Sequence, residues 1–246
     1  MRLLYAAFLF ALALPAPAQV FELPPLDKAV NYQPKQPLQV FTADGVELAQ
    51  FGTERRQFVP IAQTPKLLQD AVIAVEDARF REHSGIDPVG MARAAVAMLT
   101  GGRKQGASTI TQQVARNMFL TQRFTAERKA KEIMIALELE KKLSKDRILE
   151  LYLNEIYLGE RAYGFAAAAQ TYFGKPMDKL SIAETALLAG LPQNPAYANP
   201  VVNMARAIKR QRIVLERMRI TGVITEVQHA SAREEKIVLR GPTAAP

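Results

Sequence analysis

Hydrophobic residues recur every three to four positions over most of the chain after Pro65, which is the period of an amphipathic helix. Prolines and capping residues divide this region into segments. The pattern predicts helices over residues 66–82, 88–100, 109–119, 125–143, 145–154, 163–172, 181–190, 203–221 and 225–233. We therefore expect an all-α, mainly helical fold.

The first residues follow a different pattern. Arg2 precedes an uncharged stretch, residues 3–14, which is short for a membrane helix because such a helix needs about 20 residues. A basic start, a short apolar core and the pair Ala16 and Ala18 are typical of a secretory signal peptide. A short uncleaved anchor is the alternative. Residues 1–18 are thus interpreted as a signal-like or anchor segment, and both interpretations export the rest of the chain.

Residues 19–49 are predicted to form a linker and a hairpin. The linker is rich in proline, and an Asp44-Gly45 turn separates two short strand-like runs, residues 39–42 and 46–49. The helical domain then covers about residues 50–230, and a tail covers residues 231–246.

The charge distribution points to an anionic partner. The 246 residues carry 32 Lys and Arg against 24 Asp and Glu, a net charge of +8. Two zones more than account for this excess: residues 103–147 have a net charge of +6 and residues 204–219 a net charge of +5. Such zones suit phosphate, nucleic acid or an anionic membrane surface, and two solvated helix faces are the alternative. The absence of cysteine excludes disulfides, thiolate metal sites and a cysteine nucleophile.

Glu76 is the first candidate catalytic residue. On a helix continuing to residue 82 it would share the apolar face with Val72, Phe80 and His83, while Asp77 would point elsewhere. Loss of solvent there would raise the pKa of the Glu76 carboxyl and suit it to general acid or base work. The alternative is a carboxylate at the edge of the stripe with a neighbouring partner, and a lone histidine is more often structural.

Residues 106–117 add a polar helix face. Thr109 and Gln112 have capping-box spacing, and Thr109, Gln113, Arg116 and Asn117 would line one side of the helix. Hydroxyl, amide and guanidinium groups in a row can bind sugar hydroxyls and phosphate. A capped helix with a solvated polar face is the alternative.

A second carboxylate follows in the next predicted helix. Glu132 lies four residues after Arg128, with Lys129 beside them, and the same face continues into apolar positions. Two carboxylates from separate helices are the usual requirement of glycosyl chemistry. An ordinary surface ion pair is the alternative. Tyr152 and Asn154 are further cleft candidates, although each is more often a packing residue.

Two further features are interpreted as structural, and several motifs of other enzyme classes are absent from the sequence. Ser181 and Glu184 form a second predicted capping box, and the small residues 164–169 indicate close helix packing. No metal-ligand spacing, phosphate-binding loop or nucleophilic serine motif occurs in the sequence.

Taken together, the segments at residues 76–87, 106–117, 128–132, 148–154, 159–175 and 184–195 have a recognisable order and spacing. They resemble the motifs of the peptidoglycan glycosyltransferases, glycosyltransferase family 51. The resemblance implies a lysozyme-like fold with a head lobe and a smaller, membrane-dipping jaw. It also implies polymerisation of lipid II into β-1,4-linked glycan strands, with inversion at the donor anomeric carbon and release of undecaprenyl diphosphate.

The resemblance assigns roles to residues by motif. Glu76 becomes the general base, and Glu132 assists near the donor. Substrate-binding or motif-shaping roles fall to Asp77, Phe80, His83, Thr109, Gln112, Gln113, Arg116, Asn117, Arg128, Lys129, Tyr152 and Asn154. No cofactor is required by the sequence, although a divalent cation (Mg²⁺ or Mn²⁺) would help the diphosphate to leave.

The expected partners are lipid II, the growing lipid-linked glycan, the membrane surface and other cell-wall synthesis proteins, but not nucleic acid. The expected location is the extracytoplasmic or periplasmic face of the cytoplasmic membrane. Two alternatives stay open at this point: a lysozyme-like cell-wall hydrolase or lytic enzyme, and a non-catalytic membrane scaffold.

Overall fold

In the computed structural model helices make up more than half of the residues that the structure describes, in agreement with the predicted fold class. The structure describes residues 22–34, 38–44, 47–51, 54–100, 108–121, 123 and 125–241. The predicted signal-like segment lies outside these residues. No helix within the described ranges is both long enough and apolar enough to cross a bilayer.

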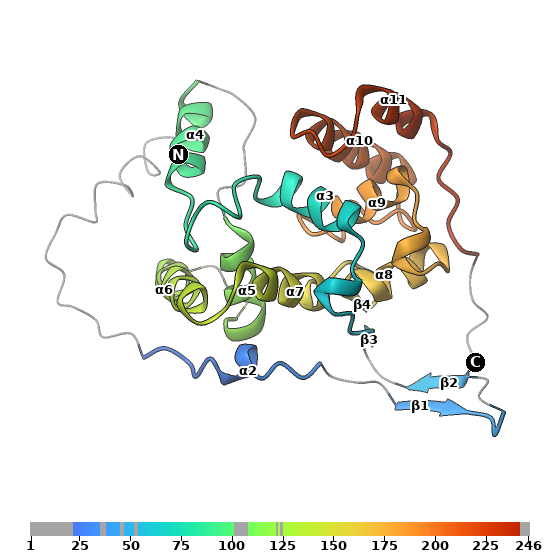
Figure 1. The fold of residues 1–246 in the computed structure, drawn as a ribbon, viewed down its shortest axis with the longest axis horizontal. Coiled ribbons are helices and arrows are strands. Elements are labelled where there is room, and N and C mark those ends of the chain that lie inside the picture. The colour runs from blue at the N-terminus through green and yellow to red at the C-terminus, as the bar shows by residue number, and fades with distance from the viewer. Residues whose placement is uncertain are drawn as a thin grey trace, which may run out of the picture.

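The helices form two groups that share one hydrophobic core (Figure 1). In the first group α5 (Ile110–Phe119) packs against α6 (Ala126–Lys142) and α7 (Lys145–Glu155). In the second group α3 (Lys66–Glu76), α9 (Ile182–Ala189) and α10 (Met204–Ile220) pack on one another, and α11 (Glu226–Glu234) covers α10. Helix α8 (Phe165–Phe173) contacts both α7 and α9, whereas α4 (Pro88–Leu99) stands apart at the upper left of Figure 1.

One predicted helix is too long. Helix α3 ends at Glu76 instead of residue 82, because Asp77 leaves the helical conformation with φ −160° and ψ 73°. Residues 77–87 form successive turns. Asp77 is buried in this segment, so the prediction that it points away from the buried side is wrong. Phe80 and His83 are also buried, but the turns, not a shared helix face, place them there.

The predicted hairpin is present. Strands β1 (Leu38–Phe41) and β2 (Glu47–Phe51) pair antiparallel, with a register shift between Val40 and Phe41. The predicted turn residue Gly45 lies outside the described residues. The pattern did not predict the short helix α2 (Asp27–Val30), the 3₁₀ turns η2 (Ile61–Gln63) and η3 (Met177–Lys179), or the parallel pair β3 (Arg55–Arg56) and β4 (Ala162–Tyr163).

Both predicted capping boxes are confirmed, at Thr109 with Gln112 and at Ser181 with Glu184. The Glu184 carboxylate also accepts from Lys175 at 2.7 Å, which supports its structural interpretation. Close packing at the start of α8 is confirmed as well. Gly164 has φ +82°, and a Cβ on it would lie 2.8 Å from the carbonyl oxygen of Asn154.

Candidate active site

Glu76 closes α3 with its carboxylate turned into the protein, where the side chain is only 10% exposed. Its Oε2 accepts a hydrogen bond from Nε2 of Gln113 at 2.9 Å. Its Oε1 is buried and has no hydrogen-bond partner among the described residues. Burial raises the pKa of the Glu76 carboxyl above its ordinary value, against the opposing effects of the Gln113 hydrogen bond and of Arg210 and Arg116. The predicted desolvated carboxylate is therefore present.

Gln113 holds the carboxylate in place from α5. Its Oε1 accepts from the Tyr152 hydroxyl of α7 at 3.3 Å, so its side-chain N–H group is left to face Glu76. Burial, followed by the nearby Glu76 charge, raises the pKa of Tyr152 well above its ordinary value. The phenol stays a neutral donor, and three helices thus meet at one carboxylate.

Arg210 of α10 completes this cluster, and sequence reasoning missed it. Its Nη2 lies 3.8 Å from Oε1 of Glu76, and its Nε donates to the carbonyl oxygen of Gly190 at 3.2 Å. Burial lowers the pKa of the Arg210 guanidinium. A signal was present in the sequence, because Arg210 lies three residues after Ala207 and four before Val214, both of which are buried.

Glu132 anchors a second cluster on α6. Its side chain is 1% exposed and accepts from Nη1 of Arg128 at 2.9 Å and from Nζ of Lys129. The Lys129 ammonium also lies 3.3 Å from Oγ of Ser108 and 3.3 Å from Oε1 of Gln112. The ion pairs of Glu132 are therefore buried, and the alternative of an ordinary surface ion pair is wrong. On α5, Gln112 contacts Lys129 of the Glu132 cluster, and the next residue, Gln113, contacts Glu76.

Asp77, His83 and Thr109 frame the two clusters. The Asp77 carboxylate accepts from the backbone N–H of Ile110 at 3.0 Å and contacts Nε2 of His83 at 3.0 Å. The Thr109 hydroxyl donates to the carbonyl oxygen of Gly85 at 2.7 Å. These contacts fix the turns after α3 to the first turn of α5, and so align Glu76 with Gln113.

The remaining predicted site residues differ in their surroundings. Phe80 is fully buried, with the Lys145 ammonium 4.5 Å from its ring centre. Arg116 and Asn117 are half-buried on α5, and the charge of Arg116 acts on Glu76. Asn154 accepts from the N–H of Val59 at 2.9 Å and donates to two backbone carbonyls, so its polar atoms tie α7 to the segment after β3. Its substrate-binding role stays a prediction.

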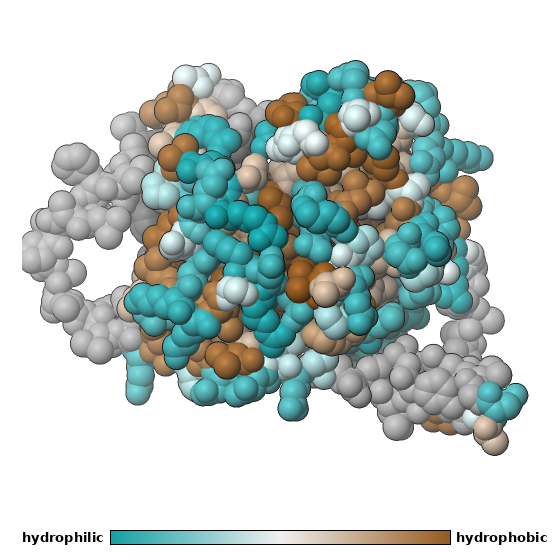
Figure 2. Space-filling model, viewed as in Figure 1, coloured by the Kyte–Doolittle hydropathy of each residue, from teal (hydrophilic) through white to brown (hydrophobic). Residues whose placement is uncertain are grey.

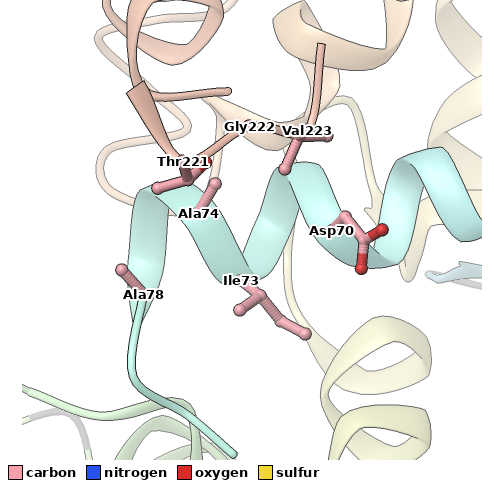
Figure 3. Close-up of a pocket in the computed structure, with 7 residues that line it drawn as sticks. All are labelled: Asp70, Ile73, Ala74, Ala78, Thr221, Gly222 and Val223. Atoms are coloured by element: carbon pink, nitrogen blue, oxygen red, sulfur yellow. The ribbon is translucent and has the colours of Figure 1, made fainter. Parts of the chain in front are cut away.

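A separate hollow of about 270 Å³ lies between α3 and the turn after α10 (Figure 3). Of the residues that line it, Asp70 is the titratable one, and Lys66 already pairs with this carboxylate. The hollow includes neither Glu76 nor Glu132. It is therefore distinct from the candidate active site.

No group of three or more His, Asp or Glu side chains that could hold a metal ion occurs within the described ranges. The Glu132 carboxylate is already held by two cationic side chains. A divalent cation stays a prediction from the resemblance.

Comparison with known proteins extends these observations. A family model described as Transglycosylase matches residues 44–219. The chain is 49% identical over 217 residues to penicillin-binding protein 1A of Neisseria flavescens, covering 88% of this chain and 27% of that protein. It is 50% identical over 217 residues to penicillin-binding protein 1A of Escherichia coli K12, covering 88% of this chain and 26% of that protein.

The chain is also similar to a solved structure of a penicillin-binding protein 1A. The crystal structure of penicillin-binding protein 1A from Haemophilus influenzae matches with a TM-score of 0.52 and 30% sequence identity, covering 86% of this chain and 22% of that one. The chain therefore spans about a quarter of the length of the curated relatives that it matches.

Proposed function

The chain belongs to the transglycosylase family, and we propose that it is a peptidoglycan glycosyltransferase that polymerises lipid II into β-1,4-linked glycan strands. The observation that carries the proposal is the buried Glu76 carboxylate, whose Oε1 has no hydrogen-bond partner among the described residues and faces cationic side chains.

In the proposed reaction Glu76 is the general base. It takes the proton from the 4-hydroxyl of the acceptor N-acetylglucosamine, whose oxygen forms a bond to the anomeric carbon of the donor. The bond from that carbon to the diphosphate oxygen breaks, and the electron pair leaves with undecaprenyl diphosphate. Attack from the opposite face inverts the donor configuration. A pKa raised by burial suits Glu76 to this step, because a stronger base removes a proton more readily.

The cationic side chains are assigned to the leaving diphosphate. Arg128 and Lys129 are held by Glu132, and Arg116 lies on α5 close enough for its charge to act on Glu76. Fixed positive groups stabilise charge that develops on a leaving group more effectively than mobile solvent does. Mg²⁺ or Mn²⁺ would supply further charge neutralisation when bound.

Substrate access is proposed to occur at a membrane. Helix α4 exposes large apolar side chains, with Val96 59% exposed and Leu99 79% exposed, and Figure 2 shows hydrophobic residues in the region where Figure 1 places α4. An exposed apolar surface of this kind suits contact with lipid. We place the chain at the extracytoplasmic or periplasmic face of the cytoplasmic membrane, with lipid II, the growing glycan and cell-wall synthesis proteins as partners.

The test is incubation of the purified chain with labelled lipid II, followed by separation of the products by size. The wild type should form polymer, and Glu76→Gln should reduce the rate by about a hundredfold or more, because an amide cannot accept the proton. Glu226→Gln removes an exposed carboxylate of α11, outside the motif segments, and should retain activity.

Two results would overturn the assignment: absence of polymer from the wild type, and undiminished polymer from Glu76→Gln. Release of sugar from finished cell wall, without use of lipid II, would instead identify a hydrolase.

A further inference from the structure

We propose that Arg210 is a positioning residue for Glu76: the guanidinium of α10 attracts the carboxylate while leaving its buried Oε1 without a hydrogen bond, so that this oxygen can accept one from the acceptor hydroxyl. This inference rests on the proposed function, in which Glu76 is the base. It assigns a task to α10, whose basic residues 204–219 indicate from sequence either a surface for an anionic partner or a solvated helix face.

The two carboxylate oxygens of Glu76 have different surroundings. Oε2 is occupied by the Gln113 amide at 2.9 Å. Oε1 lies 3.8 Å from Nη2 of Arg210, which is within the range of an ion pair but too long for a hydrogen bond. Arg210 therefore attracts the negative charge without occupying the oxygen that must receive a proton.

The guanidinium is held in this position by α9. Arg210 donates to the carbonyl oxygen of Gly190 at 3.2 Å, and the adjacent Gln211 donates to the carbonyl oxygen of Ala183 at 2.8 Å. The absence of a side chain at Gly190 makes room, because a Cβ there would lie 2.9 Å from Cγ of Arg210. Glu76 is the carboxylate with which Arg210 pairs in the described part of the chain.

The charged and titratable groups that act on Glu76 come from four elements. Arg210 on α10 and Arg116 on α5 favour the ionised carboxylate, whereas Asp77, which follows α3, opposes it. Tyr152 on α7 is a neutral phenol. If Arg210 were removed, burial would still raise the pKa of Glu76, and Arg116 and the Gln113 hydrogen bond would remain to oppose that rise.

The first test needs no substrate. The Glu76 carboxyl is titrated by ¹³C NMR in the whole 246-residue chain, with its signal assigned by loss in Glu76→Gln. We expect Arg210→Gln to raise the pKa of Glu76 by about one unit, because an adjacent opposite charge lowers a carboxyl pKa by about 1–3 units. Arg210→Lys should give a smaller rise. Arg212→Gln, which removes an exposed cation from the same helix, should give none.

The second test uses lipid II polymerisation as a function of pH. The acidic limb of kcat/KM should move to higher pH in Arg210→Gln by the same amount as the Glu76 titration. A merely structural role would lower the rate at every pH without moving the limb. If Arg210→Gln does not fold, Gly190→Ala displaces the guanidinium without removing its charge and should move the Glu76 titration in the same direction.

An unchanged Glu76 titration in folded Arg210→Gln or Gly190→Ala would overturn the inference. Failure of the wild type to polymerise lipid II would overturn the proposed function, and the NMR titration would still answer whether Arg210 controls Glu76.

Discussion

Gln113 donates a side-chain N–H to Oε2 of Glu76 over 2.9 Å, so a residue of α5 fixes the carboxylate that ends α3. The Tyr152 hydroxyl determines which end of the Gln113 amide faces Glu76. Oε2 of Glu76 is thus held by a neutral donor, whereas Oε1 has no hydrogen-bond partner among the described residues.

Replacing Gln113 by Glu tests this arrangement. The substitution keeps the shape of the side chain, removes the N–H donor and places a second carboxylate beside Glu76. Like charges so close raise the pKa of one of the pair, so more of the base is protonated at neutral pH. We expect polymerisation at pH 7 to fall about ten- to a hundredfold, because a hydrogen bond to a charged group contributes about 1.5–3 kcal/mol.

The control is Gln63→Glu, which adds the same charge at an exposed position of η2 and should leave the rate unchanged. Equal rates in the two variants, measured with labelled lipid II, would show that the Gln113 contact has no part in catalysis.

Replacing Glu132 by Gln tests the buried cluster on α6. The variant leaves Arg128 and Lys129 without their shared carboxylate in a site where Glu132 is 1% exposed. Removal of one partner of a buried ion pair costs about 3–5 kcal/mol of unfolding free energy. Glu127→Gln breaks an exposed pair with Lys131 on the same helix and should cost about 0–1 kcal/mol. Urea unfolding measures both, and a similar loss in each would contradict the buried arrangement.

The sequence predicted the helices well where local signals dominate. Apolar stripes and capping boxes such as Thr109 with Gln112 depend on residues three or four positions apart, and these signals are readable directly. The prediction failed at the end of α3, because the contact that draws Asp77 out of the helix is made with Ile110 of another helix. The pair β3 and β4 was missed because two-residue strands are too short to show a period.

The candidate site was predictable to a similar extent and for similar reasons. The pairing of Arg128 with Glu132 follows from their spacing on one helix. The contacts of Glu76 with Gln113 and Arg210 join distant segments, and no local pattern specifies such contacts. The motif resemblance placed Gln113 in the site, whereas the basic zone that contains Arg210 was attributed to solvent or to an anionic partner.

Replacing Gly164 by Ala tests the packing of α8 on α7. Gly164 has φ +82°, and a Cβ would lie 2.8 Å from the carbonyl oxygen of Asn154. Strain from the positive φ and the forced contact together should lower the unfolding free energy by about 3 kcal/mol. Gly222→Ala is the matched control, since Gly222 has φ +75° but nothing within 4 Å of a Cβ. The Gly222→Ala control should lower the unfolding free energy by about 1 kcal/mol. Equal midpoints in thermal unfolding would contradict the close approach at Gly164.

The last prediction concerns the cost of keeping Glu76 charged inside the protein. Burial raises its pKa in the folded chain above the value in the unfolded chain, which is about 4.3. Between these two values the folded chain binds more protons than the unfolded chain, so the Glu76 contribution to stability falls as pH rises through this window. Each unit of pKa difference corresponds to about 1.4 kcal/mol. Glu76→Gln removes this cost.

We therefore expect Glu76→Gln, the variant with the reduced polymerisation rate, to be more stable than the wild type at pH 7, with the stability difference shrinking as the pH is lowered towards 4. Urea unfolding at several pH values measures the difference, and Glu82→Gln gives the baseline for loss of an exposed carboxylate. A Glu76→Gln variant that is less stable than the wild type at pH 7, by a margin that grows with pH, would mean that the ionised carboxylate stabilises the fold. In that case the attraction of Arg210 and Arg116 would outweigh burial, and Glu76 would be a structural ion-pair partner with no raised basicity to offer an incoming hydroxyl.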